Sequence, residues 1–253
     1  MDKGYELRRV ARCASTNSVL LAEKGLARPV LLLADEQTAG RGRRGRRWHS
    51  APGEGLTLSL AVVLRRPLRE LAALPLVAGV AVARALHALG VARAALKWPN
   101  DIVVDGAKLG GILVETKSSQ GAVKAVIGVG INLRGAAALR TRLRREVAAL
   151  EQFIAVPDRE LLAGAIGDAL MESIAAFESR GLDAMRAEWE RLDAHAGQKL
   201  RVRLADGRVL TGVASGLEAD GALRLATRGG MRTVRSGRVV SARATLASRA
   251  RTA

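Results

Sequence analysis

Apolar residues occur in short runs that predict alternating strands and helices in the first part of the chain. After Pro29, the run VLLLAD is typical of a buried strand, and residues 56–64 predict another. Residues 76–90 predict a largely apolar helix that Gly90 closes. A shorter helix is expected over residues 18–25, because the small polar residues Ser15-Thr16-Asn17 just before it suit a helix N-cap.

The chain up to residue 195 continues this mixture of strands and helices. Asp105-Gly106 is a strong turn signal between two apolar runs and predicts a hairpin. Strands mixed with surrounding helices indicate an α/β or α+β domain with a mixed sheet over residues 1–195. The expected elements are strands at 95–98, 102–104, 111–115 and 124–132, and helices at 158–177 and 182–195.

From Gly197 onward the pattern changes. The segment QKLRVRLADGRVLTGVASGLEADGALRLAT alternates apolar and polar residues between Asp-Gly turns, and a further strand is expected near residues 233–240. This alternation predicts a second, small antiparallel domain or barrel over residues 196–253.

Composition narrows the class of protein. The chain has 253 residues, of which 49% are hydrophobic, enough for one large core or two unequal ones. No uninterrupted apolar run approaches the ~20 residues that cross a bilayer, and the N-terminus lacks the apolar core of a signal peptide. We therefore expect a cytoplasmic protein without a membrane partner. The single cysteine, Cys13, excludes an internal disulfide and is expected to be a small packing residue rather than a nucleophile.

The formal net charge of +17 favours acidic partners of any kind, including nucleic acid, free phosphates and acidic proteins. The arginines are spread along the chain, apart from a cluster between Arg41 and Arg47. The charge alone therefore names no partner.

The cluster of arginines lies in a glycine-rich loop. Gly40, Gly42 and Gly45 have the spacing of a dinucleotide-binding loop, but Pro52 and the glycines near it forbid the helix that this motif requires. No Gly-Lys-Ser/Thr follows, which excludes a Walker loop. Two interpretations stay open. The loop folds over an anionic ligand through backbone N–H groups and guanidinium donors, or it is a solvated basic turn or a nucleic-acid contact.

Two further segments carry candidate chemistry. One is Lys97-Trp98-Pro99-Asn100-Asp101, in which the proline forces an extended bend. The Asn100 and Asp101 side chains are therefore expected at a strand end, where they could bind a hydroxyl, an amine or a metal-bound water. Lys108 adds positive charge from a neighbouring strand; ordinary turn chemistry and solvent-facing lysines are the alternative. In the apolar run ending at Asn132, Gly128 and Gly130 indicate close approach by a ligand or by another strand.

Taken in order, these segments resemble the biotin protein ligase family. The resemblance spans residues 13–135 and implies a catalytic domain like those of class II aminoacyl-tRNA synthetases, followed by an SH3-like β-barrel. The matching segments are Ser15-Thr16-Asn17, the run from Gln37 through Trp48, Lys97 to Asp101, Lys108-Leu109-Gly110-Gly111 through Glu115, and Gly128 to Asn132.

The resemblance also implies roles for individual residues. Lys108 is expected beside the biotin carboxylate and the α-phosphate of ATP, with Arg43 and Asp101 as the other catalytic candidates, and Trp48 is expected to stack on adenine. The implied biotin-binding residues are Ser15, Thr16, Asn17, Gln37, Arg41, Gly42, Arg43 and Lys108, and the implied ATP-binding residues are Arg46, Trp48, Lys97, Asn100, Asp101 and Asn132.

The implied activity is that of an ATP-dependent biotin–[acetyl-CoA-carboxylase] ligase. Such an enzyme adenylates biotin, releases pyrophosphate and transfers biotin to a lysine of a biotin carboxyl carrier protein. This chemistry needs charge neutralisation and alignment rather than a covalent nucleophile. Mg²⁺ is expected to arrive with ATP near Asp101, without a cage of protein ligands.

Two other functions fit parts of the sequence. A lipoate protein ligase would share the chemistry, but lipoate has no ureido ring to pair with Ser15-Thr16-Asn17 and Gln37, and unpaired buried donors cost about 1–3 kcal/mol each. A basic nucleic-acid-binding protein would fit the charge. Stacking recognition of bases is disfavoured, because only 2% of the residues are aromatic and none follows Trp189.

Family members that also repress transcription carry a helix-turn-helix domain ahead of the catalytic core. Only fourteen residues precede Ser15, so we expect no repressor activity and no specific DNA binding. A gel-shift titration with the protein's own biotin-operon DNA tests this, and tight sequence-specific binding would contradict it.

Overall fold

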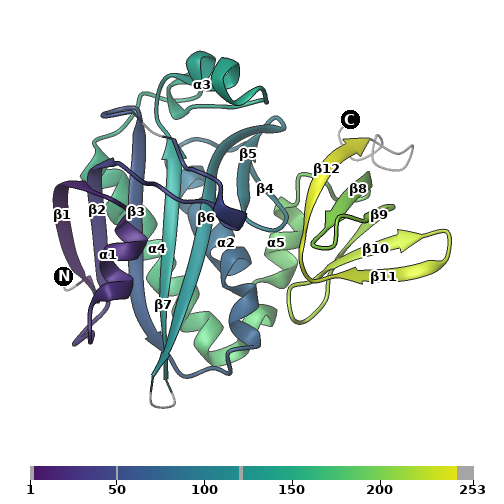
Figure 1. Cartoon of the computed structure of the whole chain (residues 1–253), viewed down its shortest axis with the longest axis horizontal. Helices are drawn as coiled ribbons and strands as arrows, with labels where there is room; N and C mark the ends of the chain where they lie inside the picture. Colours follow the sequence, from purple (N-terminus) through teal and green to yellow (C-terminus); the bar gives the residue numbers. More distant parts are fainter. Residues whose placement is uncertain (1–2, 50, 120–121, 244–253) are drawn as a thin grey trace.

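The chain folds around two sheets that are joined by a short connection. The computed structural model describes residues 3–49, 51–119 and 122–243. A seven-stranded sheet with the order β1-β2-β3-β7-β6-β5-β4 is followed by a five-stranded sheet with the order β11-β10-β9-β8-β12 (Figure 1). Residues 244–253 of the predicted second domain lie outside the described part of the chain.

The larger sheet is mixed, which confirms the expected fold class. Strands β1 and β2 pair in parallel, and every other neighbouring pair is antiparallel. Its strands are β1 (Glu6–Cys13), β2 (Val30–Gln37), β3 (Gly55–Leu64), β4 (Ala94–Lys97), β5 (Asp101–Val104), β6 (Ala107–Ser119) and β7 (Ala122–Asn132).

Strand β2 shows why the run after Pro29 is apolar throughout: it is covered on both faces. Leu31 and Leu33 belong to the main core, while Val30 and Leu32 pack with Leu20 of α1 (Thr16–Ala22) on the opposite face. A strand buried on both faces cannot alternate with polar residues.

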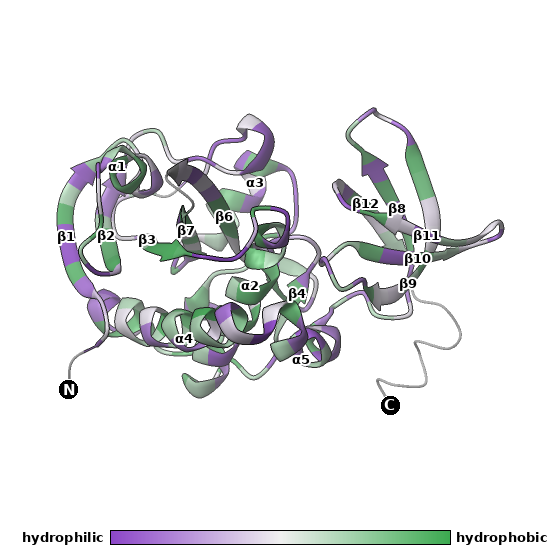
Figure 2. Ribbon diagram, turned by 90° about the horizontal axis from the view of Figure 1, so that it is seen from below, coloured by the Kyte–Doolittle hydropathy of each residue, from purple (hydrophilic) through white to green (hydrophobic). Residues whose placement is uncertain are grey.

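Two long helices, α2 (Leu74–Ala88) and α4 (Arg159–Arg180), cover one face of the sheet, and α1 covers the other (Figure 2). By length and composition the segment Glu70–Ala88 could cross a membrane, with a mean hydropathy of 1.7, but 72% of it is buried inside the protein. Its apolar character is that of a core helix.

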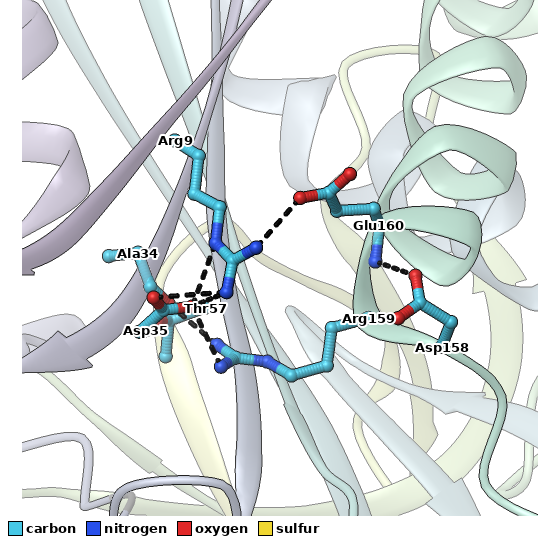
Figure 3. Close-up of polar contacts among 7 residues, drawn as sticks. All are labelled: Arg9, Ala34, Asp35, Thr57, Asp158, Arg159 and Glu160. Atoms are coloured by element: carbon cyan, nitrogen blue, oxygen red, sulfur yellow. Dashed lines mark hydrogen bonds and ion pairs between the residues drawn. The ribbon is translucent and has the colours of Figure 1, made fainter.

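A polar network fastens the start of α4 to the edge of the sheet (Figure 3). Asp158 caps the helix by accepting hydrogen bonds from the backbone N–H of Glu160 at 2.8 Å and of Leu161. Arg9 of β1 donates to both Glu160 and Asp35, and Arg159 donates to the same Asp35 carboxylate at 3.0 Å. These charge-assisted bonds hold α4 against the two strands that lead into the site described below.

The connection between the sheets contains α5 (Arg186–Leu192), and the second sheet begins at Lys199. The two sheets contact each other where the Trp98 indole N–H donates to Gly221 O at 3.2 Å. The strands are β8 (Lys199–Leu204), β9 (Val209–Leu217), β10 (Leu223–Thr227), β11 (Gly230–Val234) and β12 (Gly237–Arg243).

The second sheet differs from the expectation in two respects. Within the described residues, β11 and β12 are the two edges and do not pair, so the sheet stays open instead of closing into a barrel. The single strand expected at residues 233–240 is wrong: β11 ends at Val234 and β12 begins at Gly237. The dipeptide Ser236-Gly237 is a turn signal that the expected single strand overlooked. Arg235 in this turn pairs with Asp220 at 3.0 Å.

Most of the other predicted elements are confirmed. Asp105 and Gly106 both adopt positive φ values, 51° and 79°, as the expected two-residue hairpin turn requires. The helix expected over residues 182–195 is shorter than predicted, because a 3-10 turn, Gly181–Ala184, precedes α5. Strand β1 and the short helix α3 (Ala136–Leu143) were not predicted; both are rich in arginine and lack a clear apolar pattern.

Candidate functional site

The predicted site residues converge on one cavity of about 240 Å³. It lies where the glycine-rich loop crosses strands β6 and β7, and Gly237 to Val239 of the second sheet complete its wall. All but one of the residues named from the sequence line it: Ser15, Thr16, Asn17, Gln37, Arg41, Gly42, Arg43, Arg46, Trp48, Lys97, Asn100, Asp101 and Lys108.

One end of the cavity is a buried network of neutral polar groups. Gln37 Oε1 accepts hydrogen bonds from the backbone N–H of Thr16 at 2.8 Å and from the Thr16 hydroxyl at 3.1 Å. The Ser59 hydroxyl lies 2.6 Å from both Thr16 Oγ1 and Asn17 Oδ1. Ser15 is the N-cap of α1 but makes no capping bond with its side chain. The Gln37 side chain, and not that of Ser15, therefore satisfies the first backbone N–H of α1.

Gly128 creates the space that Asn17 occupies. A Cβ atom at Gly128 would overlap the Asn17 amide oxygen. Because residue 128 lies in the middle of β7, this close approach explains a glycine in an apolar strand.

The glycine-rich loop is folded back on itself rather than extended. Trp48 N donates to Gly40 O at 2.9 Å, and Gly42 N donates to Arg46 O at 2.7 Å. A Cβ at Gly40 would lie 2.8 Å from Trp48 O, so this return of the chain requires glycine there. Within the described residues, no helix lies between Trp48 and the start of β3, so the glycine spacing lacks the helix that a dinucleotide-binding motif requires.

Trp48 lines the cavity, and its ring packs against the backbone of β7 at Gly130. A side chain at Gly130 would overlap its ring, and Lys108 Nζ lies 5.9 Å from the ring centroid. Within the described residues the buried Trp48 Nε1 has no hydrogen-bond partner. A buried donor without a partner is rare in native proteins, and it marks a position where a ligand acceptor would fit.

Lys108 and Asp101 form a close ion pair on β6 and β5. Burial lowers the pKa of Lys108, and the Asp101 carboxylate opposes this shift. Arg43 of the loop reaches the same region, 3.5 Å from Asn100 Oδ1, and burial together with Arg44 lowers the pKa of its guanidinium.

The cavity is strongly positive. Among the described residues that line it, Asp101 is the only acid. An anion that enters would replace like-charge repulsion among the cations with charge-assisted hydrogen bonds. The basic side chains are Arg41, Arg43, Arg44, Arg46, Arg47, Lys97, Lys108, Arg145 and Arg238.

Asn132 is the predicted site residue that does not line the main cavity. It lies in a smaller adjoining cavity beside Trp48 and Lys108, and its amide N–H groups donate to Lys108 O at 3.2 Å and Ala148 O at 3.0 Å. Its side chain therefore ties β7 to the segment after α3.

Sequence reasoning missed several residues of the site, among them Ser59, Glu115, Arg145 and Arg238. The sequence did contain a signal for Ser59, because it is a polar residue within an apolar strand. It also contained one for Glu115, which ends the segment that begins at Lys108. Arg145 and Arg238 had none, because α3 and the second sheet reach the cavity only through the tertiary fold.

Among the described residues, no group of three or more His, Cys, Asp or Glu side chains could hold a metal ion. Burial raises the pKa of Cys13, which disfavours the thiolate.

Two family models match most of the chain. The Biotin/lipoate A/B protein ligase family matches residues 10–132, and the Biotin protein ligase C terminal domain matches residues 195–240. The biotin–[acetyl-CoA-carboxylase] ligase of Mycobacterium tuberculosis is 34% identical over 92% of this chain and 88% of its own length. The chain belongs to the biotin protein ligase family.

Two further members of the biotin protein ligase family place the chain within it. The bifunctional ligase/repressor BirA of Escherichia coli is 34% identical over 83% of this chain, which spans 66% of the length of BirA. The structure of the Aquifex aeolicus biotin protein ligase in complex with biotin and ATP superposes with a TM-score of 0.79 at 28% identity, covering 95% of this chain and 99% of that one.

Proposed function

We propose that the protein is an ATP-dependent biotin protein ligase that forms biotinoyl-5′-AMP and transfers biotin to a lysine of a biotin carboxyl carrier protein. The observation that carries the proposal is the cavity itself. It joins a buried neutral polar network, which suits a ureido ring, to a positive region, which suits a carboxylate and phosphates.

The neutral end suits biotin for a specific reason. Thr16 donates two hydrogen bonds to the Gln37 carbonyl oxygen. Within the described part of the chain, the Gln37 amide N–H groups remain as donors for a ligand. A ureido ring offers one carbonyl acceptor and two N–H donors, which the Gln37 amide and the hydroxyl oxygens around Asn17 would satisfy. Lipoate offers none of these groups and would leave the network unpaired.

The positive end suits the adenylation step. The carboxylate oxygen of biotin attacks the α-phosphorus of ATP, the bond from that phosphorus to the pyrophosphate oxygen breaks, and pyrophosphate leaves. Lys108 and Arg43 would neutralise the carboxylate and the developing charge on the α-phosphoryl oxygens. Trp48 would provide the apolar surface for the adenine ring, and its unpaired N–H a donor. Lys97, Arg46, Asn100 and Asn132 would complete the nucleotide side.

Magnesium would come with the nucleotide. Mg²⁺ binds through one or two carboxylates together with substrate phosphates and keeps several waters, and one carboxylate, Asp101, lines the cavity among the described residues. In this structure Asp101 pairs with Lys108, so the ion would have to share or displace that contact.

In the second step the lysine amine of the carrier attacks the mixed anhydride, forms an amide and expels AMP. Asp101 would orient the amine or accept its proton. The positive surface would favour approach of an acidic carrier, and we propose that the reaction takes place in the cytoplasm.

Incubation with biotin, ATP, Mg²⁺ and a purified biotin carboxyl carrier domain tests the proposal. Intact-mass spectrometry should show one added biotinoyl group on the carrier, and peptide mapping should place it on one lysine. Modification with lipoate but not with biotin would overturn the proposal in favour of a lipoate ligase. No modification with either compound would favour a binding protein.

The basic loop should retain the reactive intermediate. We expect Arg43→Ala to release biotinoyl-AMP about tenfold faster, because a charge-assisted contact contributes about 1.5–3 kcal/mol. The readout is biotin attached non-specifically to lysines of serum albumin, measured by streptavidin blotting. Arg93→Ala, at an exposed ion pair with Asp105 away from the loop, is the matched control. Equal labelling by the two variants would exclude this role for the loop.

A further inference from the structure

One carboxylate oxygen joins the basic loop to the neutral end of the cavity. Glu115 Oε2, on β6, accepts a hydrogen bond from Arg41 Nη2 at 2.9 Å and another from Asn17 Nδ2 at 2.8 Å. Arg41 belongs to the glycine-rich loop and Asn17 to α1. Glu115 itself does not line the cavity, so any effect it has on a ligand passes through these two side chains.

The contact with Glu115 fixes the orientation of the Asn17 amide. Asn17 Nδ2 also donates to Leu113 O at 3.2 Å, while Asn17 Oδ1 lies 2.6 Å from the Ser59 hydroxyl. The amide nitrogen therefore faces β6 and the amide oxygen faces Ser59. A rotated amide would set its oxygen against the Leu113 carbonyl and the Glu115 carboxylate, two acceptors that offer it no proton, so these two partners fix the orientation.

The same contact also holds the loop. Within the described residues, Arg41–Glu115 is the ion pair that connects the loop to the large sheet. The other side-chain bonds that the loop makes across the cavity are longer, at 3.3 Å from Arg44 to Ser236 and 3.5 Å from Arg43 to Asn100. Among the described residues, Glu115 is thus the carboxylate that a side chain of the loop contacts directly across to the large sheet.

We propose that Glu115 is a positioning residue that couples closure of the basic loop to the orientation of Asn17, and so determines how long biotin and biotinoyl-AMP stay in the cavity. This inference rests on the proposed ligase function. When the loop opens, Glu115 loses the cation that shares its oxygen, and the contact that fixes Asn17 changes with it. The loop and the ureido end of the cavity therefore respond as a unit.

The variant Glu115→Gln tests the coupling. Glutamine has the same shape but no charge, and its single amide oxygen is a weaker acceptor for both donors. We expect biotinoyl-AMP to dissociate about tenfold faster from this variant, measured by chasing preformed labelled intermediate with excess unlabelled biotin and ATP. Glu23→Gln is the matched control, because Glu23 pairs with Arg8 at 3.0 Å and its side chain has the same 27% exposure as that of Glu115.

A double-mutant cycle separates positioning from a general structural role. If Glu115 acts through Arg41, then Glu115→Gln should accelerate release much less in an Arg41→Gln background than in the wild type. Release from the wild type should also accelerate with salt more than release from Glu115→Gln, because the Arg41 side chain is 45% exposed. Thermal unfolding midpoints of Glu115→Gln and Glu23→Gln should agree.

Equal release from the wild type and Glu115→Gln, or effects that simply multiply in the cycle, would overturn this inference while leaving the ligase function intact. A wild type that forms no biotinoyl-AMP would overturn the proposed function and this inference together. The inference is supported if Glu115→Gln accelerates release about tenfold in the wild-type background and has no such effect in the Arg41→Gln background.

Discussion

Replacing Lys108 by alanine should lower biotin-dependent pyrophosphate exchange by about 10²–10³-fold, the size of effect seen when one preorganised donor to a developing negative charge is removed. Lys108 is the buried cation on β6 that pairs with Asp101 and lies beside the Trp48 ring. Its removal leaves the Asp101 carboxylate without its partner and adds electrostatic repulsion toward an anionic substrate. The exchange of labelled pyrophosphate into ATP gives the rate directly.

The control for this variant is Lys117→Ala, an exposed lysine on the same strand. Both variants should keep the circular dichroism spectrum of the wild type, because neither side chain forms part of the apolar core. Exchange by Lys108→Ala at the wild-type rate would remove Lys108 from the mechanism.

The second large effect should come from adding one carbon atom at Gly128. Gly128→Ala places a methyl group where the Asn17 amide lies, so Asn17 must move and its hydrogen bonds with Ser59 and Glu115 break. Buried polar groups left unpaired cost about 1–3 kcal/mol, so the dissociation constant for biotin should rise about 10- to 100-fold. Calorimetric titration with biotin measures it.

Gly25→Ala is the matched control for Gly128→Ala, since a Cβ at Gly25 would meet no other atom within 4 Å. ATP binding to Gly128→Ala should change little, because the proposed nucleotide side of the cavity involves Trp48 and Lys108 instead. Biotin affinity equal to that of the wild type would contradict the assignment of Asn17 to the biotin end of the cavity.

Local signals were strong enough to predict much of the larger domain. The unbroken run of β2 and the Asp105-Gly106 turn depend on near neighbours in the sequence, and the structure confirms both. Loop 40–48 could be separated from a dinucleotide motif for the same reason, since Pro52 excludes the following helix.

The remaining features depend on contacts between distant segments. Arg238 reaches the cavity only because the second sheet contacts the first at Trp98 and Gly221. No local pattern predicts that contact, nor the failure of β11 and β12 to pair. The sharing of Glu115 between Arg41 and Asn17 is likewise set by the tertiary fold, because these residues come from a loop, a strand and a helix far apart in the sequence.

The central claim, that the cavity activates biotin as an adenylate, is tested most directly by exchange of labelled pyrophosphate into ATP with biotin and, in parallel, with lipoate. The account predicts exchange that requires biotin, saturates with it and is absent with lipoate. Exchange supported by lipoate alone, or by neither acid, would contradict it.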